Sequence, residues 1–230
     1  MMKKLFVVSD IHRHCTLLKA ALQDAGFDPH NENHLLIGCG DYFDRGSENL
    51  QVLQFLERLK NKVLLRGNHE DLLLKLLHTG KLLPHHYING TLQTLQDFLG
   101  RYAIDPTDDT LELSGKSRMV DRVCDFIGET VDYFETENYL FVHGWLPENG
   151  DHSPEGWEKA RWIRWTQAYQ GTPPIPGKTL VCGHVPTFVK TPGCADIFYG
   201  DGLIAIDAGT FDSGQINVLV LEDNCPKAFF

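Results

Sequence analysis

The sequence has no closely spaced pair of cysteines and no long hydrophobic run. Its six cysteines, at positions 15, 39, 124, 182, 194 and 225, include no Cys-x-x-Cys pair, which excludes a zinc ribbon and a small disulfide framework. No apolar run approaches the roughly 20 residues of a membrane-spanning helix, and the run that follows Met-Met-Lys-Lys ends at Asp10. We therefore expect reduced thiols, a cytoplasmic protein and no membrane contact.

Basic charge is also scarce. The chain has 21 Lys and Arg against 31 Asp and Glu, a formal net charge of −10. This balance repels the phosphate backbone of nucleic acids, and no local basic patch offsets it, so we expect no nucleic-acid partner and no nuclease activity. With 230 residues, 42% of them hydrophobic, the chain can bury one sizeable core, and residues 1–230 are expected to form a single domain.

Apolar runs and amphipathic stretches alternate along the first third of the chain. Strand-like runs at 5–8, 35–37 and 63–65 alternate with helix-like stretches at 15–25, 47–60 and 69–79, which predicts a βαβαβα unit with parallel strands. Ser47 is the expected N-cap of the second helix. Further strands are expected at 131–135, 139–142, 179–182, 203–206 and 216–221.

Residues from about 80 to 130 differ from the rest of the chain. Pro and Gly interrupt them, yet Leu92, Leu95 and Phe98 keep a helical period. This pattern predicts a helical cap inserted between strands, with Thr91 as the N-cap of one of its helices.

Five strand-like runs are followed by Asp, Asn or His. The stretches are Ser-Asp-Ile-His at 9–12, Gly-Asp-Tyr-Phe-Asp-Arg-Gly at 40–46, Gly-Asn-His-Glu at 67–70, His-Gly at 143–144 and Gly-His at 183–184. A single histidine of this kind is more often structural. Parallel strands, however, end at one edge of a sheet, where the five stretches together offer carboxylates, imidazoles and an amide. Such a mixture suits divalent first-row transition metals.

The order of these motifs, D-x-H, GDxxDRG, GNHE, HG and GHxP, resembles the phosphoprotein phosphatase family of the calcineurin-like metallophosphoesterases, in its bacterial and phage-lambda-like branch. The match runs from residue 9 to about 187, with a similar Ile-Asp-Ala-Gly-Thr at 206–210. The resemblance implies an α/β fold, a four-layer αββα sandwich that carries the cap as an insertion.

The same resemblance implies two divalent metal ions, with manganese expected first and iron or zinc as alternatives. A water between two such ions ionises to hydroxide at neutral pH and attacks phosphorus in line. The implied ligands are Asp10 and His12 for the first ion, Asn68, His143 and His184 for the second, and Asp41 as a bridge.

The remaining motif residues match groups that act on the phosphate ester. Arg45 is the expected phosphate clamp, because a guanidinium binds phosphoryl oxygens in a bidentate manner; Asn68 also faces the phosphate in this family. A second clamp is expected at Arg164, in a Trp-x-Arg segment, with Arg161 as its competitor; the alternative is that either arginine lies on a helix surface.

His69 is the general acid that the resemblance implies, and Asp44 would orient its imidazole and raise its pKa. The alternative is that His69 only supports a metal ligand. Glu70 is expected to pair with an arginine and to take no part in catalysis.

Hydrolysis of phosphoserine and phosphothreonine in proteins is the favoured function, with phosphotyrosine as a further substrate. The alternative is hydrolysis of dinucleoside polyphosphates such as diadenosine tetraphosphate. A non-catalytic regulatory module is less favoured, because the full motif set is present. The expected partners are thus phosphorylated proteins or small phosphoesters.

One position departs from the family pattern. Arg13 stands where the family has glycine after the D-x-H motif. We expect Arg13 to have a negative φ and to direct its side chain to solvent. Two alternatives are a third cation for the substrate phosphate and a side chain that obstructs the site.

Overall fold

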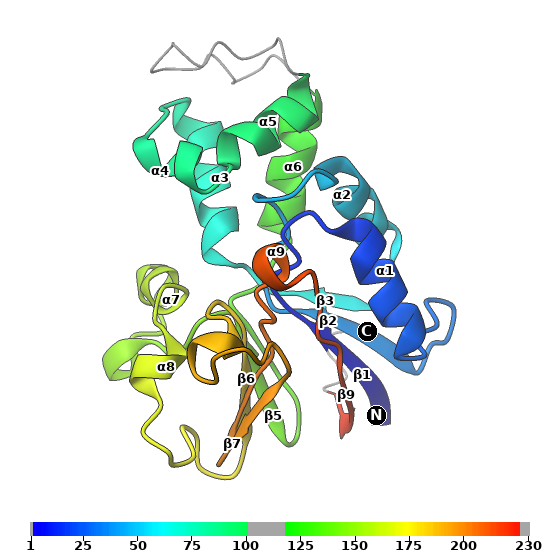
Figure 1. Cartoon of the computed structure of the whole chain (residues 1–230), viewed down its shortest axis with the longest axis vertical. Helices are drawn as coiled ribbons and strands as arrows, with labels where there is room; N and C mark the ends of the chain where they lie inside the picture. Colours follow the sequence, from blue (N-terminus) through cyan, green and yellow to red (C-terminus); the bar gives the residue numbers. More distant parts are fainter. Residues whose placement is uncertain (1, 101–117, 226–230) are drawn as a thin grey trace.

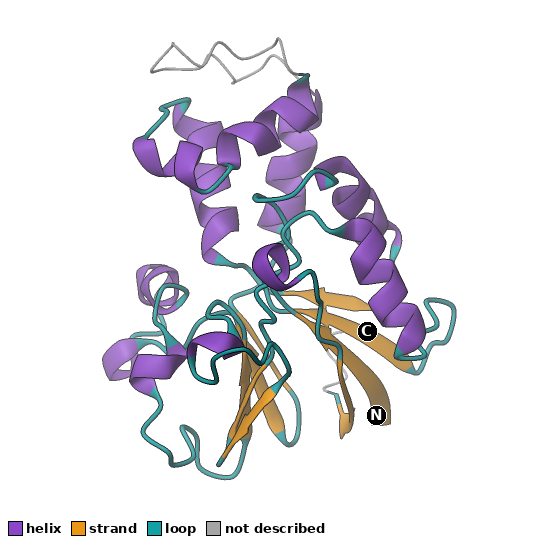
Figure 2. Cartoon of the chain, viewed as in Figure 1, coloured by secondary structure: helices purple, strands orange, loops and turns teal. Residues whose placement is uncertain are grey.

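Two β-sheets packed face to face form the centre of the molecule, with helices on both outer faces. The computed structural model describes residues 2–100 and 118–225. Figure 1 and Figure 2 show helices α1–α6 on one side of the paired sheets and α7 and α8 on the other. The four-layer α/β arrangement expected from the sequence is therefore confirmed.

The first sheet has the strand order β3-β2-β1-β9. Strands β1 (Met2–Val8), β2 (His34–Gly38) and β3 (Lys62–Leu64) are parallel, and β9 (Leu219–Asn224) is antiparallel to β1. The register pairs Val8 with Gly38, so the loops after β1 and β2 leave the sheet side by side.

The second sheet has the order β4-β5-β6-β8-β7. Its parallel strands are β5 (Tyr139–Val142), β6 (Thr179–Cys182) and β8 (Leu203–Ala205), and antiparallel strands β4 (Tyr133–Glu135) and β7 (Phe198–Gly200) form its edges. Strand β7 was not predicted, because three residues at a sheet edge carry no readable alternation of polar and apolar side chains.

Alternate residues of β1 belong to different cores. Leu5 and Val7 pack between the two sheets, whereas Phe6 and Val8 pack against the helices over the first sheet. A strand buried on both faces needs an uninterrupted apolar run, which explains the Leu-Phe-Val-Val sequence. A third core joins the outer face of the second sheet to Trp157.

The helices over the first sheet are α1 (Cys15–Asp24), α2 (Asn49–Arg58), α3 (Asn68–Thr79) and α6 (Arg118–Gly128). The N-cap of helix α2 is Glu48, whose side chain makes no capping hydrogen bond, so the prediction of Ser47 as N-cap is wrong. The Glu48 side chain instead accepts hydrogen bonds from Thr16. None of the helices within 2–100 and 118–225 is long and apolar enough for a membrane span.

The other side of the molecule carries shorter helices. Helices α7 (Pro154–Ala160) and α8 (Trp165–Ala168) cover the second sheet, and α9 (Thr210–Ser213) follows β8. Two 3₁₀ turns, η1 and η2, span Glu148–Gly150 and Thr187–Val189.

The segment predicted as a cap is helical where the structure describes it. Helices α4 (Pro84–Ile88) and α5 (Thr91–Leu99) lie at the end of α3 that is far from the sheets, and α6 runs beside α3 (Figure 1). Positions 101–117 of the predicted cap lie outside the described residues. Thr91 is the first residue of α5, and its N-cap is Gly90 with φ 81°. The expected capping role of Thr91 is therefore wrong.

Replacement of Tyr42 by Phe tests how the strand ends are joined. The buried Tyr42 hydroxyl lies 2.8 Å from both the Gly38 and the Leu65 carbonyl oxygens and accepts from the Gly40 amide at 3.3 Å. Tyr42→Phe removes the hydroxyl's bonds to the Leu65 carbonyl and the Gly40 amide, whereas the Gly38 carbonyl keeps the Leu65 amide as a donor at 2.7 Å. We expect the free energy of unfolding to fall by about 1–3 kcal/mol in denaturant titration. Tyr133→Phe, at a 44% exposed position, is the control and should change it by less than about 0.5 kcal/mol. Equal effects would contradict the role given to the hydroxyl.

Candidate metal centre

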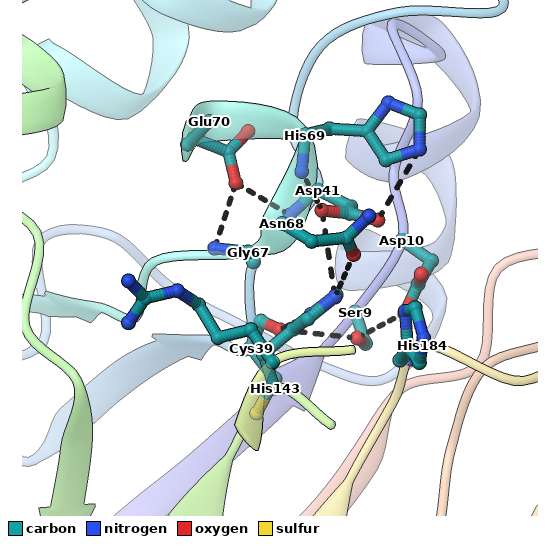
Figure 3. A network of polar contacts seen from close by, with 12 residues as sticks. Ser9, Asp10, Cys39, Asp41, Gly67, Asn68, His69, Glu70, His143 and His184 are labelled. Carbon is teal, nitrogen blue, oxygen red and sulfur yellow. Dashed lines mark hydrogen bonds and ion pairs between the residues drawn. The ribbon is translucent and has the colours of Figure 1, made fainter. Parts of the chain in front are cut away.

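Six predicted ligands meet where parallel strands of both sheets end. Asp10 and His12 follow β1, Asp41 follows β2, Asn68 begins α3 after β3, and His143 and His184 follow β5 and β6. Figure 3 shows Asp10, Asn68, His143 and His184, which follow different strands, gathered around Asp41. The sequence interpretation thus placed them at the correct edge of both sheets.

The loops that carry these residues have an unusual backbone. Eight described residues other than glycine have a positive φ, and seven of them belong to this region: Asp10, His12, Arg13, Asp41, Asp44, Arg45 and His184. A left-handed conformation costs a residue with a Cβ roughly 1–2 kcal/mol, and such strain gathers at functional sites. Backbone hydrogen bonds between the two loops hold it, among them Arg13 N–H to the Tyr42 carbonyl at 2.9 Å.

Asp41 is the centre of the cluster. Its carboxylate is buried, with one oxygen 3.9 Å from His12 Nε2 and the other 3.5 Å from His143 Nε2. Two groups of side chains have ligand atoms within 4.8 Å of one another: Asp41 with His12 and His69, and Asp41 with His143 and His184. Asp41 is common to both groups, as a residue bridging two ions must be.

The histidine tautomers fit a cation at this place. Nδ1 of His12 donates to the Phe43 carbonyl at 2.9 Å, and Nδ1 of His143 donates to the Cys39 carbonyl at 2.7 Å. Because carbonyl oxygens only accept, Nδ1 carries the proton, and Nε2 of each ring carries a lone pair when the imidazole is neutral. His143 Nε2 lies 2.8 Å from Asn68 Oδ1, so two lone pairs face each other, and a metal ion satisfies both.

The charges of the cluster favour metal binding as well. Burial, followed by the effect of His69, lowers the pKa of His12 to about 3, and burial with His143 lowers the pKa of His184 to about 3. Burial alone would raise the pKa of Asp41, but the surrounding imidazoles outweigh it and lower that pKa. At neutral pH His12 and His184 are therefore neutral imidazoles and Asp41 is an ionised carboxylate, the forms that bind metals.

Asp10 joins the two sheets at the site. One of its oxygens accepts from the Ser9 hydroxyl and from the His184 amide, the latter at 2.9 Å. A side chain at Gly183 would collide with Ser9 and with the Asp10 carboxylate. The glycine before His184 is therefore required for the close approach of the second sheet's loop to the first.

Glu70 binds backbone amides and not an arginine. Its buried carboxylate accepts from the Gly67, Asp41 and Tyr42 amides at 2.9, 2.8 and 2.9 Å. The expected pairing with arginine is wrong because Glu70 lies in the interior, in the first turn of α3, where its carboxylate binds these three backbone amides. Glu70 thereby fixes the loop of Asp41 against the start of α3 (Figure 3).

His69 and Asp44 form the pair expected from the motifs. Nδ1 of His69 lies 2.7 Å from an Asp44 oxygen. Burial opposes protonation, but Asp41 and the hydrogen-bonded Asp44 outweigh it and raise the pKa of His69 to about 9. Asp44 is fully buried and also accepts from the Thr91 and Thr94 hydroxyls, at 2.8 and 2.6 Å. Sequence reasoning missed both threonines, which no motif marks.

Arg45 lies over the same cluster. Its guanidinium approaches His12 Nε2 at 3.4 Å and His69 Nε2 at 3.3 Å. Gly90 packs closely on the Arg45 backbone, where a Cβ would lie 3.0 Å from the Arg45 nitrogen. The cation is therefore held at the side of the cluster where His69 presents its second ring nitrogen.

The two candidate arginines of the Trp-rich segment differ sharply. Arg161 is buried and bonded to Asp71, with Nε to Oδ2 at 2.5 Å, and to Asp132 at 2.7 Å, so its guanidinium is committed to the protein. Arg164 is exposed, two residues after Trp162, whose ring centroid lies 6.2 Å from that of His184. Of the two, only Arg164 has a side chain accessible to substrate.

Arg13 does not point to solvent, so the expectation for this residue is wrong. Its φ is 66°, its exposed fraction is 4%, and its Nη1 lies 3.4 Å from an oxygen of Asp97 on α5. Asn49 donates to the same oxygen at 2.9 Å. The physical reason is tertiary: hydrogen bonds to the neighbouring loop fix the backbone, and the buried guanidinium pairs with Asp97, whose side chain is 27% exposed, in place of water.

A family model for calcineurin-like phosphoesterases matches residues 3–205, and the chain belongs to this family. It is a metallophosphoesterase and a hydrolase, as the motif order predicted, and the family uses divalent metal ions. The candidate ligand groups around Asp41 fit such ions.

Part of the chain is similar in sequence to bacterial protein phosphatases. Serine/threonine-protein phosphatase 2 of Escherichia coli (strain K12) is 38% identical over 78 residues, 34% of this chain and 34% of that protein. Serine/threonine-protein phosphatase 1 of Salmonella typhimurium (strain LT2) is 38% identical over 72 residues, 31% of this chain and 32% of that protein. The matched part thus spans about a third of these curated relatives.

Solved structures share the fold over nearly the whole chain. A putative diadenosine tetraphosphatase has a TM-score of 0.61 at 15% identity, covering 98% of this chain and 95% of that one. A protein serine/threonine phosphatase from Saccharomyces cerevisiae has a TM-score of 0.57 at 14% identity, covering 98% and 81%. At these identities the likeness concerns the fold.

His143→Ala should remove one of two metal ions. The variant deletes the imidazole that faces Asn68 and Asp41 and leaves Asp10 and His12 intact. We expect the manganese content of loaded protein, measured by elemental analysis after desalting, to fall from two ions per chain to one. His78→Ala, at an exposed position on α3, is the control and should keep both. Unchanged metal content in His143→Ala would contradict the ligand role.

Arg161→Leu and Arg164→Leu should differ in stability. The first leaves Asp71 and Asp132 without their cation, and we expect a loss of about 3 kcal/mol in unfolding free energy, the low end for a buried pair, because the Asp132 side chain is 38% exposed. Arg164→Leu, at an exposed site, should cost less than about 0.5 kcal/mol. Denaturant titration measures both, and a larger loss for Arg164→Leu would reverse the assignment.

Proposed function

We propose that this chain is a metal-dependent phosphomonoester hydrolase that acts on phosphoserine and phosphothreonine in proteins, and on phosphotyrosine as a further substrate. The observation that carries the proposal is the His69–Asp44 pair, 2.7 Å between nitrogen and oxygen, set between Asp41 and the Arg45 guanidinium. A proton donor, a phosphate-binding cation and a metal-binding carboxylate within one cluster are what phosphomonoester hydrolysis requires.

The proposed cofactor is a pair of divalent ions, manganese first and iron or zinc as alternatives. Asp10 and His12 would hold one ion, and Asp41 would be shared. Asn68, His143 and His184 would hold the other. The chemistry that such ions supply is the activation of a water as nucleophile and the neutralisation of phosphoryl charge.

The protein's own cations bind and orient the phosphate. Arg45 presents its guanidinium beside His12 and His69, where it can bind two phosphoryl oxygens and stabilise the charge that they carry in the transition state. We propose Arg164 as the second cation, because Trp162 in the same segment contacts His184. The Asn68 amide is proposed to contact the phosphate as well.

His69 is proposed to donate the proton to the departing oxygen. Nδ1 of its ring is held by Asp44, so Nε2 is the atom that delivers the proton, and Nε2 lies 3.3 Å from Arg45 Nη2. The leaving oxygen of a phosphate bound to Arg45 would therefore lie beside the acid. Asp44 stabilises the imidazolium before the transfer.

Hydrolysis of dinucleoside polyphosphates is the second candidate. The specific observation in its favour is the TM-score of 0.61 to the structure of a putative diadenosine tetraphosphatase, of which 95% is covered. The similarity to curated serine/threonine-protein phosphatases at 38% identity supports the first candidate.

We propose a cytoplasmic location, which the reduced thiols of Cys15, Cys39, Cys124, Cys182 and Cys194 support.

Parallel assays with manganese distinguish the two substrates. We expect kcat/KM for a phosphothreonine peptide to exceed that for diadenosine tetraphosphate at least about tenfold, a difference of about 1.4 kcal/mol in transition-state binding. Phosphate release and adenosine nucleotide chromatography measure the two reactions. His69→Asn, which keeps the metal ligands, is the control for contaminating phosphatases and should lose turnover of the peptide. The reverse preference would assign the chain to dinucleoside polyphosphates.

A further inference from the structure

We propose that the cap helix α5 positions the proton donor: the Thr91 and Thr94 hydroxyls fix the Asp44 carboxylate and, through it, the His69 imidazole. This inference rests on the proposed role of His69 as general acid. It makes the cap a part of proton transfer as well as a cover for the first sheet.

The first support is the set of hydrogen bonds that described residues make to the Asp44 carboxylate. One carboxylate oxygen accepts from His69 Nδ1 at 2.7 Å and from Thr91 Oγ1 at 2.8 Å, and the other accepts from Thr94 Oγ1 at 2.6 Å. Three donors in different directions fix the plane of a carboxylate. Because the side chain of Asp44 has no exposed surface, water cannot replace a lost hydroxyl without rearrangement.

The second support is the backbone of the loop that carries Asp44. Asp44 and Arg45 have φ values of 68° and 63°, a conformation that surrounding structure must stabilise. Gly90, immediately before α5, packs on the Arg45 backbone nitrogen. The start of α5 therefore supports this strained loop at the backbone as well as at the side chain.

The third support is the anchoring of α5 one turn further along. Asp97 accepts from Asn49 at 2.9 Å and pairs with Arg13 at 3.4 Å. Arg13 follows the ligand His12, and its amide donates to the carbonyl of Tyr42 in the Asp44 loop. Helix α5 thus contacts both loops that form the first half of the metal centre.

A purely structural role predicts a different kinetic result. If the threonines only satisfy a buried carboxylate, their loss lowers activity equally for all leaving groups. If they position the acid, the loss is larger for esters whose leaving group needs a proton. The readout is therefore the ratio of kcat for p-nitrophenyl phosphate to kcat for phenyl phosphate.

The variants are Thr91→Val, Thr94→Val and the double change. Thr79→Val is the matched control, since the Thr79 hydroxyl bonds only near the end of α3. We expect kcat of the double variant to fall by about tenfold or more on phenyl phosphate and by less than about threefold on p-nitrophenyl phosphate. Thr91→Ser and Thr94→Ser keep a hydroxyl and should restore the parent ratio.

The metal content of each variant, measured in parallel, should stay at the parent value. An equal loss of kcat on both esters, or a failure of Thr91→Ser and Thr94→Ser to restore the parent ratio, would overturn the positioning role. If the double variant does not fold, the single variants and their serine counterparts give the same comparison.

His69→Asn separates this inference from the proposed function. If His69→Asn loses more on phenyl phosphate and the threonine variants do not, only the role of α5 is wrong. If His69→Asn itself loses equally on both esters, His69 is not the acid and both proposals are overturned. In the His69→Asn background the threonine changes should have no further effect on the ratio.

Discussion

The carboxylate of Glu70, buried and bonded to three backbone amides, is the interaction on which the site depends. It joins the loop after β2, which carries Asp41, to the start of α3, which carries Asn68 and His69. A buried carboxylate with three donors is a strong and directional link, whereas a side chain that lacked these acceptors would leave the amides unpaired. The position of Asp41 between the histidines follows from this link.

The loops that carry the site residues have a strained backbone, which surrounding contacts must hold in place. Seven non-glycine residues of the site have positive φ, a conformation that isolated loops of this sequence would not keep. The second sheet, through His184 and Asp10, and the cap, through Thr94 and Asp44, supply hydrogen bonds that hold it. The cluster is therefore a product of both sheets and the cap, and no single motif suffices to build it.

Much of this arrangement could be predicted from sequence, and three of the misassigned residues share a cause. Buried parallel strands have long apolar runs, so their ends, and the residues that follow them, were readable. Arg13, Thr91 and Glu70 were misassigned because their partners, such as Asp97, lie far away in sequence, and local preferences for φ or capping gave the wrong answer. Tertiary contacts decided each of these positions.

Shared ligation by Asp41 is the central claim, since Asp41 belongs to both candidate ligand groups and would make them one dinuclear site. Electron paramagnetic resonance of metal-free protein titrated with Mn²⁺ tests it most directly. The account predicts that the spectrum at two equivalents is that of two exchange-coupled ions and that Asp41→Asn abolishes the coupling together with phosphatase activity. A spectrum of isolated ions at every loading, in a protein that hydrolyses p-nitrophenyl phosphate, would contradict it.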